Sequence, residues 1–126
     1  MLMIVGSARD AANLLADHFR HVAGERIAVL HLGPERRVLG CDESAVTPGD
    51  SAPLPIRDIL AAALKRDSRG LILAHNHPGG DPRPSAADVA ATRSLARAAA
   101  SLGIRLHDHL IFAGGDCRSF RELGLL

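Results

Sequence analysis

The chain has 126 residues, which is enough for one compact domain with a core and too few to divide comfortably into two. Apolar residues make up 47% of the sequence but aromatic residues only 2%, so aromatic platforms for stacking nucleic-acid bases are almost absent. Fifteen basic and fourteen acidic side chains leave a formal net charge of +1, which argues against a dedicated binder of DNA or of an anionic membrane. We therefore expect a single domain over residues 1–126.

The first half of the chain is predicted to hold a short helical segment, a hairpin and a second helix. Ser7 followed by Asp10 resembles a capped helix start within residues 1–24, and apolar residues recur behind it at helical spacing. A Gly-Pro-Glu turn separates two stretches that are rich in branched apolar residues. The patterns predict a helix over 8–22, strands over 26–32 and 37–46, a loop over 47–55 and a helix over 56–66.

The second half begins with an unbroken apolar run, Leu-Ile-Leu-Ala, of the kind expected for a central strand that is buried on both faces. Ser85 and Asp88 form a Ser-x-x-Asp start for a long alanine-rich helix, which Gly103 ends. The patterns predict a strand over 71–74, a loop over 76–84, a helix from 85 to about 102, a strand over 104–112, a Gly-Gly turn and a last capped turn over 119–122. This order indicates an α/β fold, a single domain with a mixed central sheet between helices.

The opening Met-Leu-Met-Ile-Val stretch is interrupted by Arg9 and Asp10 well before it reaches the length of a signal peptide or a membrane span. We therefore expect a cytoplasmic protein with no membrane partner. Cys41 and Cys117 lie far apart, so neither a zinc knuckle nor a redox pair is predicted.

His75, His77 and Asp88 are predicted to bind one metal ion. His75 and His77 are two residues apart at a predicted strand end, where an extended chain projects both imidazoles to the same side. Asp88 lies in the first turn of the next helix, from which its carboxylate can reach back to the same ion. Two nitrogens and one oxygen leave a fourth position for water, which is a catalytic zinc arrangement. We expect one Zn²⁺ per chain, although the same donors also accept iron, cobalt or manganese.

Hydrolysis of an amide by zinc also needs a carboxylate that is not a ligand, to move the proton of the attacking water. Four glutamates are available: Glu35 and Glu122 lie in turns and Glu43 in an outer strand. Glu25 opens the first strand and could point at a metal on the neighbouring strand, so we predict that Glu25 is the catalytic acid/base. Ser85 could donate a hydrogen bond to the oxyanion.

Two other interpretations of these residues stay open. Ser85 and Asp88 also fit an ordinary capping box that satisfies backbone N–H groups at a helix start. His107 and His109 form a rival His-x-His pair, because residues two apart on a strand are expected to share a face. This pair lacks a distant third ligand and fits a structural or surface role, or a contact to the zinc ligands.

The run His75-Asn76-His77-Pro78, six residues, Ser85, two residues, Asp88 resembles the signature of the JAMM (JAB/MPN) metalloproteases, His-x-His-Pro-x6-Ser-x2-Asp. The surrounding sequence resembles the RadC branch in particular, both before Ser85 and in the later stretches Leu-His-Asp-His-Leu-Ile-Phe-Ala-Gly-Gly and Ser-Phe-Arg-Glu. The likeness runs from about Glu25 to the C-terminus. Longer proteins of that branch carry a helix-hairpin-helix segment before this domain, whereas here one short helix precedes Glu25.

The resemblance implies a cytidine-deaminase-like α/β fold of the JAB/MPN type and zinc on His75, His77 and Asp88. It also implies that Glu25 is the general acid/base and that Ser85 donates a hydrogen bond in the transition state. Its activity would be that of a metallopeptidase or isopeptidase acting on a peptide or protein.

Two further functions stay open beside hydrolysis. A DNA-repair-associated factor acting on or near nucleic acid is suggested by the RadC likeness and by arginines near the site, Arg83, Arg93 and Arg97. The third candidate is a metal-stabilised interaction module without catalysis. The sequence does not predict the oligomeric state.

Overall fold

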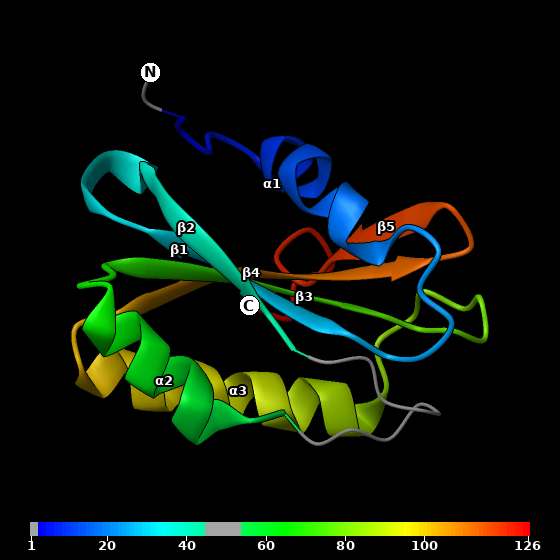
Figure 1. Ribbon diagram of the computed structural model, residues 1–126. Helices are drawn as coiled ribbons and strands as arrows, with labels where there is room; N and C mark the ends of the chain where they lie inside the picture. The colour runs from blue at the N-terminus through cyan, green and yellow to red at the C-terminus, as the bar shows by residue number, and fades with distance from the viewer. Residues whose placement is uncertain (1–2, 45–53) are drawn as a thin grey trace.

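A five-stranded sheet forms the centre of the protein in the computed structural model, which describes residues 3–44 and 54–126 (Figure 1). Its strand order is β2-β1-β3-β4-β5; β3 and β4 are parallel, and the other neighbours are antiparallel. The predicted α/β fold with a mixed central sheet is confirmed. The strands are β1 Ile27–Leu32, β2 Val38–Glu43, β3 Gly70–Asn76, β4 Arg105–Ala113 and β5 Asp116–Ser119.

Helices cover both faces of this sheet, with α2 and α3 side by side on one face and α1 on the other (Figure 1). The helices are α1 Ala8–Leu15, α2 Ile56–Lys65 and α3 Ala86–Ser101, with 3-10 turns η1 Ala16–Phe19 and η2 Pro34–Arg36. Among the residues described, we find no helix with the length and apolar character needed to cross a membrane.

The central strand β3 is buried along its whole length because helices pack on both of its sides. Leu71 and Leu73 belong to the core under α2 and α3, whereas Ile72 and Ala74 belong to the core under α1. Since side chains alternate along a strand, the next residue, His75, turns towards the α2/α3 face. This alternation decides which face of the sheet carries the site.

The first helix is shorter than the sequence pattern predicts. We expected a helix over 8–22, but α1 ends at Leu15 and continues as the 3-10 turn η1. The apolar repeat runs on to Phe19, whose ring stacks on Phe112 with the ring centroids 4.9 Å apart. Helical geometry ends at Arg20, which is extended with a ψ of 133°, and His21 then takes a φ of 58°. The apolar residue at position 19 therefore serves a tertiary contact and does not indicate that the α-helix continues to it.

The other elements differ from the prediction mainly at their ends. The strand predicted over 71–74 extends to Asn76, so it includes His75, and the strand predicted over 37–46 runs from Val38 to Glu43. The prediction missed β5, because its four residues include two exposed charged ones and show no apolar alternation. The predicted positions 45, 46 and 47–53 lie outside the described residues.

Candidate metal centre

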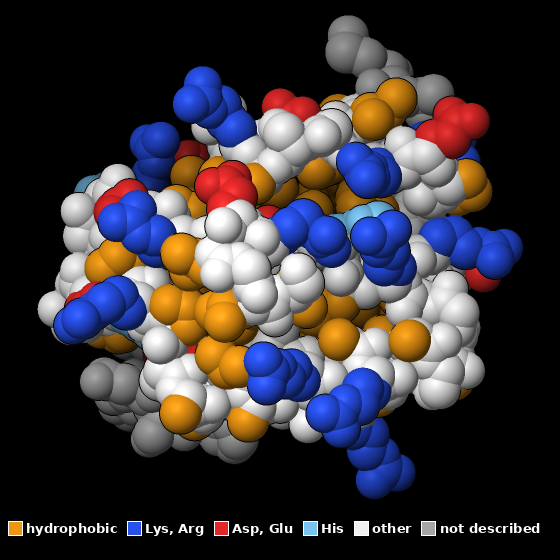
Figure 2. Space-filling model, turned by 180° about the vertical axis from the view of Figure 1, so that it is seen from behind, with side chains coloured by type: hydrophobic (Ala, Val, Ile, Leu, Met, Phe, Trp, Pro, Cys, Tyr) orange, Lys and Arg blue, Asp and Glu red, His pale blue; other side chains and the backbone are white. Residues whose placement is uncertain are grey.

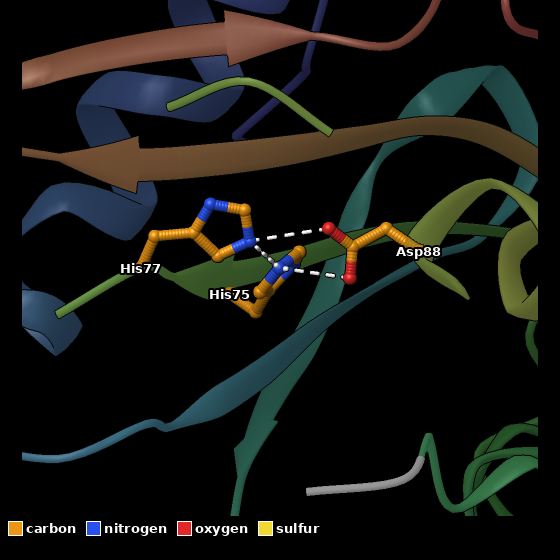
Figure 3. A group of neighbouring side chains, drawn as sticks. All are labelled: His75, His77 and Asp88. Carbon is orange, nitrogen blue, oxygen red and sulfur yellow. Dashed lines mark hydrogen bonds and ion pairs between the residues drawn. The ribbon is translucent and has the colours of Figure 1, made fainter. Parts of the chain in front are cut away.

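His75 and His77 lie where β3 leaves the sheet (Figure 3). The ring of His75 is buried on the α2/α3 face, on the same side of the strand as Leu73. His77 follows the strand, and its backbone N–H donates to the carbonyl of Phe112 at 2.9 Å. The Nε2 atoms of the two histidines are 2.9 Å apart. The predicted convergence of the two imidazoles is therefore present.

Asp88 reaches the two histidines from the first turn of α3 (Figure 3). One of its carboxylate oxygens is 3.1 Å from Nε2 of His77 and the other is 3.6 Å from Nε2 of His75. The carboxylate also accepts the backbone N–H of Ser85 at 2.9 Å, while the Ser85 hydroxyl accepts the backbone N–H of Asp88 at 3.0 Å. Asp88 therefore takes part in the capping box and also approaches the two histidines.

The spacing of these three side chains fits a zinc ion. The donor atoms of His75, His77 and Asp88 all lie within 4.8 Å of one another. A tetrahedral zinc ion with bonds of about 2.1 Å would hold neighbouring donors about 3.4 Å apart. The observed separations of 2.9, 3.1 and 3.6 Å bracket that value. The group could therefore hold a metal ion after small shifts of its side chains.

A chain of hydrogen bonds through His109 and Thr92 orients the ring of His75 from its Nδ1 side. The hydroxyl of Thr92 donates to the backbone carbonyl of Asp88 at 2.7 Å, so its oxygen accepts from Nδ1 of His109, also at 2.7 Å. Nε2 of His109 is then left as an acceptor, and Nδ1 of His75 donates to it at 2.6 Å. This order of donors gives His75 the tautomer whose Nε2 lone pair faces His77 and Asp88, as a metal ligand requires.

His77 is oriented by a separate contact on its own loop. Its Nδ1 donates to the backbone carbonyl of Asp81 at 2.8 Å, which again leaves the Nε2 lone pair for a metal. Asp81 in turn accepts from the guanidinium of Arg83 at 2.7 Å. Of the three arginines named for a nucleic-acid role, Arg83 is thus already paired with a carboxylate.

The protonation of the site suits metal binding. Burial lowers the pKa of His75 to about 4 and holds the pKa of His109 well below its ordinary value, so both rings are neutral at pH 7. Burial raises the pKa of Asp88, but the hydrogen bonds from Ser85 and the nearby histidines outweigh it, and the pKa is lowered overall. Neutral imidazoles beside an ionised carboxylate are the forms that bind a divalent cation.

A β-bulge separates the two histidines of the rival pair. His107 is an extra residue in β4, because its neighbours Leu106 and Asp108 pair with consecutive residues of β3. His107 and Asp108 therefore both face the α1 side, and His109 faces α3, where it contacts Thr92. The expectation that His107 and His109 share a face is wrong, because it assumed regular alternation through the bulge. Among the described residues, the one group with metal-binding spacing is that of His75, His77 and Asp88.

Glu25 lines the same small cavity as two of the metal-binding candidates. Its side chain is buried, and it borders a space of about 30 Å³ together with His75, Asp88 and His109. That space has room for a water molecule, because one needs at least about 10–15 Å³. The arrangement is the one expected of a carboxylate that handles the proton of an attacking water, although this role stays a prediction.

Asn76 holds the segment that carries Glu25. Its amide oxygen accepts the backbone N–H of Arg26 at 2.7 Å, and its amide nitrogen donates to the carbonyl of Gly24 at 2.8 Å. The residues on both sides of Glu25 are thus tied to the end of β3. Sequence reasoning missed Asn76, although its place between two histidines on a strand indicates that it faces the opposite way.

A larger cavity adjoins His77 on the other side of the site. It encloses about 450 Å³ and is lined by His77, Pro78, Phe19, Phe112 and the β4–β5 turn. Ser85 lies outside the linings of both cavities, at the exposed start of α3. Its hydroxyl accepts from Asp88 and keeps its own proton for donation elsewhere, so the predicted contact to an oxyanion stays a prediction.

Comparison with known proteins finds one family that covers almost the whole chain. A family model described as the RadC-like JAB domain matches residues 5–125. A UPF0758 protein from Moorella thermoacetica is 37% identical over 123 residues, which are 98% of this chain and 54% of that protein. UPF0758 proteins from Rhodobacter capsulatus and Coxiella burnetii are 42% and 39% identical, over 84% and 97% of this chain and 50% and 54% of their own lengths.

The chain therefore spans about half the length of the curated relatives it matches. The name UPF0758 describes no activity, substrate or partner.

Proposed function

The chain belongs to the RadC-like JAB domain family, and we propose that it is a zinc-dependent hydrolase of the JAMM type that cleaves an amide bond in a peptide or protein. The observation that carries this proposal is the meeting of two kinds of group around one small cavity. His75 and Asp88, two of the three metal-binding donors, line it together with Glu25, which supplies a separate carboxylate.

Each residue of the site then has a distinct task. When bound, zinc would polarise the scissile carbonyl and lower the pKa of water to about 7. Glu25 takes a proton from the attacking water and passes it to the leaving nitrogen. Ser85 donates a hydrogen bond to the oxygen of the carbonyl as negative charge develops there. Asn76 keeps Glu25 in reach by bonding to the backbone on both of its sides.

The cavity beside His77 supports a peptide as the substrate. Its volume of about 450 Å³ falls in the usual range for ligand pockets, and its wall combines the rings of Phe19 and Phe112 with backbone of the Gly114–Gly115 turn. We infer that a side chain next to the scissile bond enters this cavity while the amide lies over the metal-binding group.

The test combines metal content with cleavage of a defined peptide library. Wild-type protein, His77→Ala, Glu25→Gln and the control His18→Ala are purified identically without a chelator and analysed for bound metal. We expect about one zinc per chain in the wild type, Glu25→Gln and His18→Ala, and almost none in His77→Ala. Cleavage, followed by mass spectrometry, is expected to persist in the wild type and His18→Ala and to be lost in both other variants.

The opposite results separate the competing functions. Cleavage that persists in Glu25→Gln would remove Glu25 from the mechanism. Zinc that stabilises the fold without any cleavage would favour an interaction module, and salt-dependent binding of DNA would favour the nucleic-acid factor.

A further inference from the structure

A third cavity lies on the α1 face of the sheet, and none of the metal-binding candidates lines it. It encloses about 230 Å³. Its floor is apolar and consists of Val5, Leu32 and Ile72. On the back of the molecule, basic side chains gather around a histidine (Figure 2). The cavity therefore combines an apolar floor with a cationic rim.

Three arginines from different parts of the chain form this rim. Arg36 comes from η2, Arg105 begins β4, and Arg121 follows β5. All three are exposed, and none of them forms an ion pair within the part of the chain that the structure describes. Arg121 is oriented by a hydrogen bond from its Nε to the carbonyl of His107 at 2.7 Å. The three guanidinium groups thus remain available to an anion.

Two acidic residues also line the cavity but do not neutralise the rim. The carboxylate of Asp108 accepts from the hydroxyl of Ser119 at 2.5 Å and from the backbone N–H groups of His109 and Arg121 at 2.8 and 3.0 Å. It is therefore occupied by neutral donors. Glu122 is exposed at the margin. The cavity is thus lined by three cationic and two anionic side chains, and one of the two carboxylates is already hydrogen-bonded within the protein.

The bulge in β4 places His107 in the middle of this rim. Its ring lies over Gly70, where an added Cβ would overlap the imidazole, so the glycine provides the space for the ring. Burial and then Arg105, Arg36 and Arg121 lower the pKa of His107. The ring is neutral at pH 7 and can donate one N–H to a ligand.

The backbone that carries Arg36 is held in an unfavourable conformation. Glu35 and Arg36 have φ values of 61° and 58°, in the left-handed region that non-glycine residues rarely adopt. The carbonyl of Arg36 accepts the backbone N–H of Val5 at 3.1 Å, which ties the turn to the N-terminal segment. Such strain persists where surrounding contacts impose it, and it is concentrated at functional sites.

We propose that this cavity binds a phosphate group carried by a small ligand. The planar forks of guanidinium groups match the oxygens of phosphate and can bind them in pairs. Ser7 and Ala8 at the start of α1 also line the cavity. Because the carboxylate of Asp10 already accepts the backbone N–H of Gly6 at this helix start, the arginines supply the positive charge for the ligand. The apolar floor accommodates an organic body attached to the phosphate. Because this cavity shares no lining residue with the metal-binding group or with the cavity beside His77, the ligand is distinct from the hydrolysed substrate.

Titration calorimetry on the full chain tests this proposal with inorganic phosphate and phenyl phosphate. We expect inorganic phosphate to bind with a Kd of the order of 1 mM. Arg105→Ala and Arg121→Ala should each weaken binding at least about tenfold, because each removes a charged donor. Arg97→Ala, which removes an exposed arginine of α3, and His77→Ala should leave it unchanged.

The arms of the experiment identify the source of the phosphate. Tighter binding of phenyl phosphate supports a phosphate attached to an apolar body, and equal binding supports the phosphate group alone. Absence of binding up to about 10 mM, an equal loss in Arg97→Ala, or a loss confined to His77→Ala would overturn the proposal. If a single-stranded oligonucleotide bound more tightly than phenyl phosphate, the ligand of this site would be a nucleic acid and not a small molecule.

Discussion

The two sides of the β4 bulge carry similar residues in very different surroundings. On the α3 side, His109 is buried and both of its nitrogens are bonded, to His75 and Thr92. On the α1 side, His107 is half-buried and lies among exposed arginines at the mouth of a cavity. One extra residue in a strand thus directs two nearby imidazoles to opposite faces.

The difference between the sides lies in preorganisation. The α3 side has a closed network in which each donor is assigned, so a metal would meet ligands that are already oriented. The α1 side has positive charge without a partner among the described residues, so its ligand must supply the missing negative charge. We therefore expect substitutions on the α3 side to affect stability and metal affinity, and those on the α1 side to affect anion affinity.

The largest effect is expected from His109→Ala. The substitution leaves a cavity in the core and removes the acceptor of the His75 Nδ1–H group, which should cost about 3 kcal/mol of the free energy of unfolding. Zinc affinity should fall by about 10–100-fold, as for other residues that orient metal ligands. Urea unfolding and zinc competition with a chromophoric chelator measure these quantities.

His107→Ala is the matched control, because it removes the same side chain on the other side of the bulge. Its expected cost is below about 1 kcal/mol, with zinc affinity unchanged. Similar losses in both variants would contradict the division between the two faces.

A smaller effect is expected from deletion of His107. Without this residue, β4 regains regular alternation and pairs with consecutive residues of β3, while His109 keeps its direction. We expect zinc binding to be retained and phosphate affinity to fall about tenfold, a change of about 1.4 kcal/mol. Zinc competition with the chelator and calorimetry with phosphate measure the two affinities. Loss of zinc with retention of phosphate would show that the bulge is needed by the metal side instead.

The smallest effect concerns the salt dependence of the pH response in the chelator-treated protein. The pKa values of His107 and His109 are lowered in the folded state, so the unfolded chain binds more protons below the ordinary histidine pKa of about 6.5. The free energy of unfolding should therefore fall as pH decreases from 7 to 5, and His31 and His75 add to the same trend.

Salt should separate the two sides of the bulge in that experiment. High salt screens the exposed arginines that help to lower the pKa of His107, but it leaves the burial of His109 unchanged. The pH dependence should thus be less steep at high salt in the wild type, and His107→Asn should remove most of this salt effect, a change below about 1 kcal/mol. Urea unfolding at three pH values and two salt concentrations measures it, and an undiminished salt effect in His107→Asn would assign it to other groups.

The convergence of His75, His77 and Asp88 could be predicted because its information is local in the sequence. His75, His77 and Asp88 are joined by one strand end, one loop and one capped helix start, each with its own signal. Glu25 required one further assumption, that the first strand neighbours the one carrying His75, and the observed pairing of β1 with β3 supports it.

The remaining features could not be predicted, because they depend on the pairing register of the strands or on tertiary packing. The bulge at His107 exists only in the pairing of β3 with β4, and regular alternation gave the opposite orientation. Thr92 resembles any polar residue of a helix until α3 packs over His109. The arginine rim joins residues from three distant parts of the chain, so no local spacing could indicate it.

Asp88 has a consequence for the way such signatures change during evolution. Its carboxylate both caps α3, through the N–H of Ser85, and faces His77. A descendant that lost its metal would still keep Asp88 under selection, because the cap stabilises the helix by about 1 kcal/mol. Ser85 and Asp88 would then outlast the proposed activity in the sequence record. Glu25 has no part in that helix cap, so its replacement in a homologue would be the earlier sign of a domain that has ceased to be an enzyme.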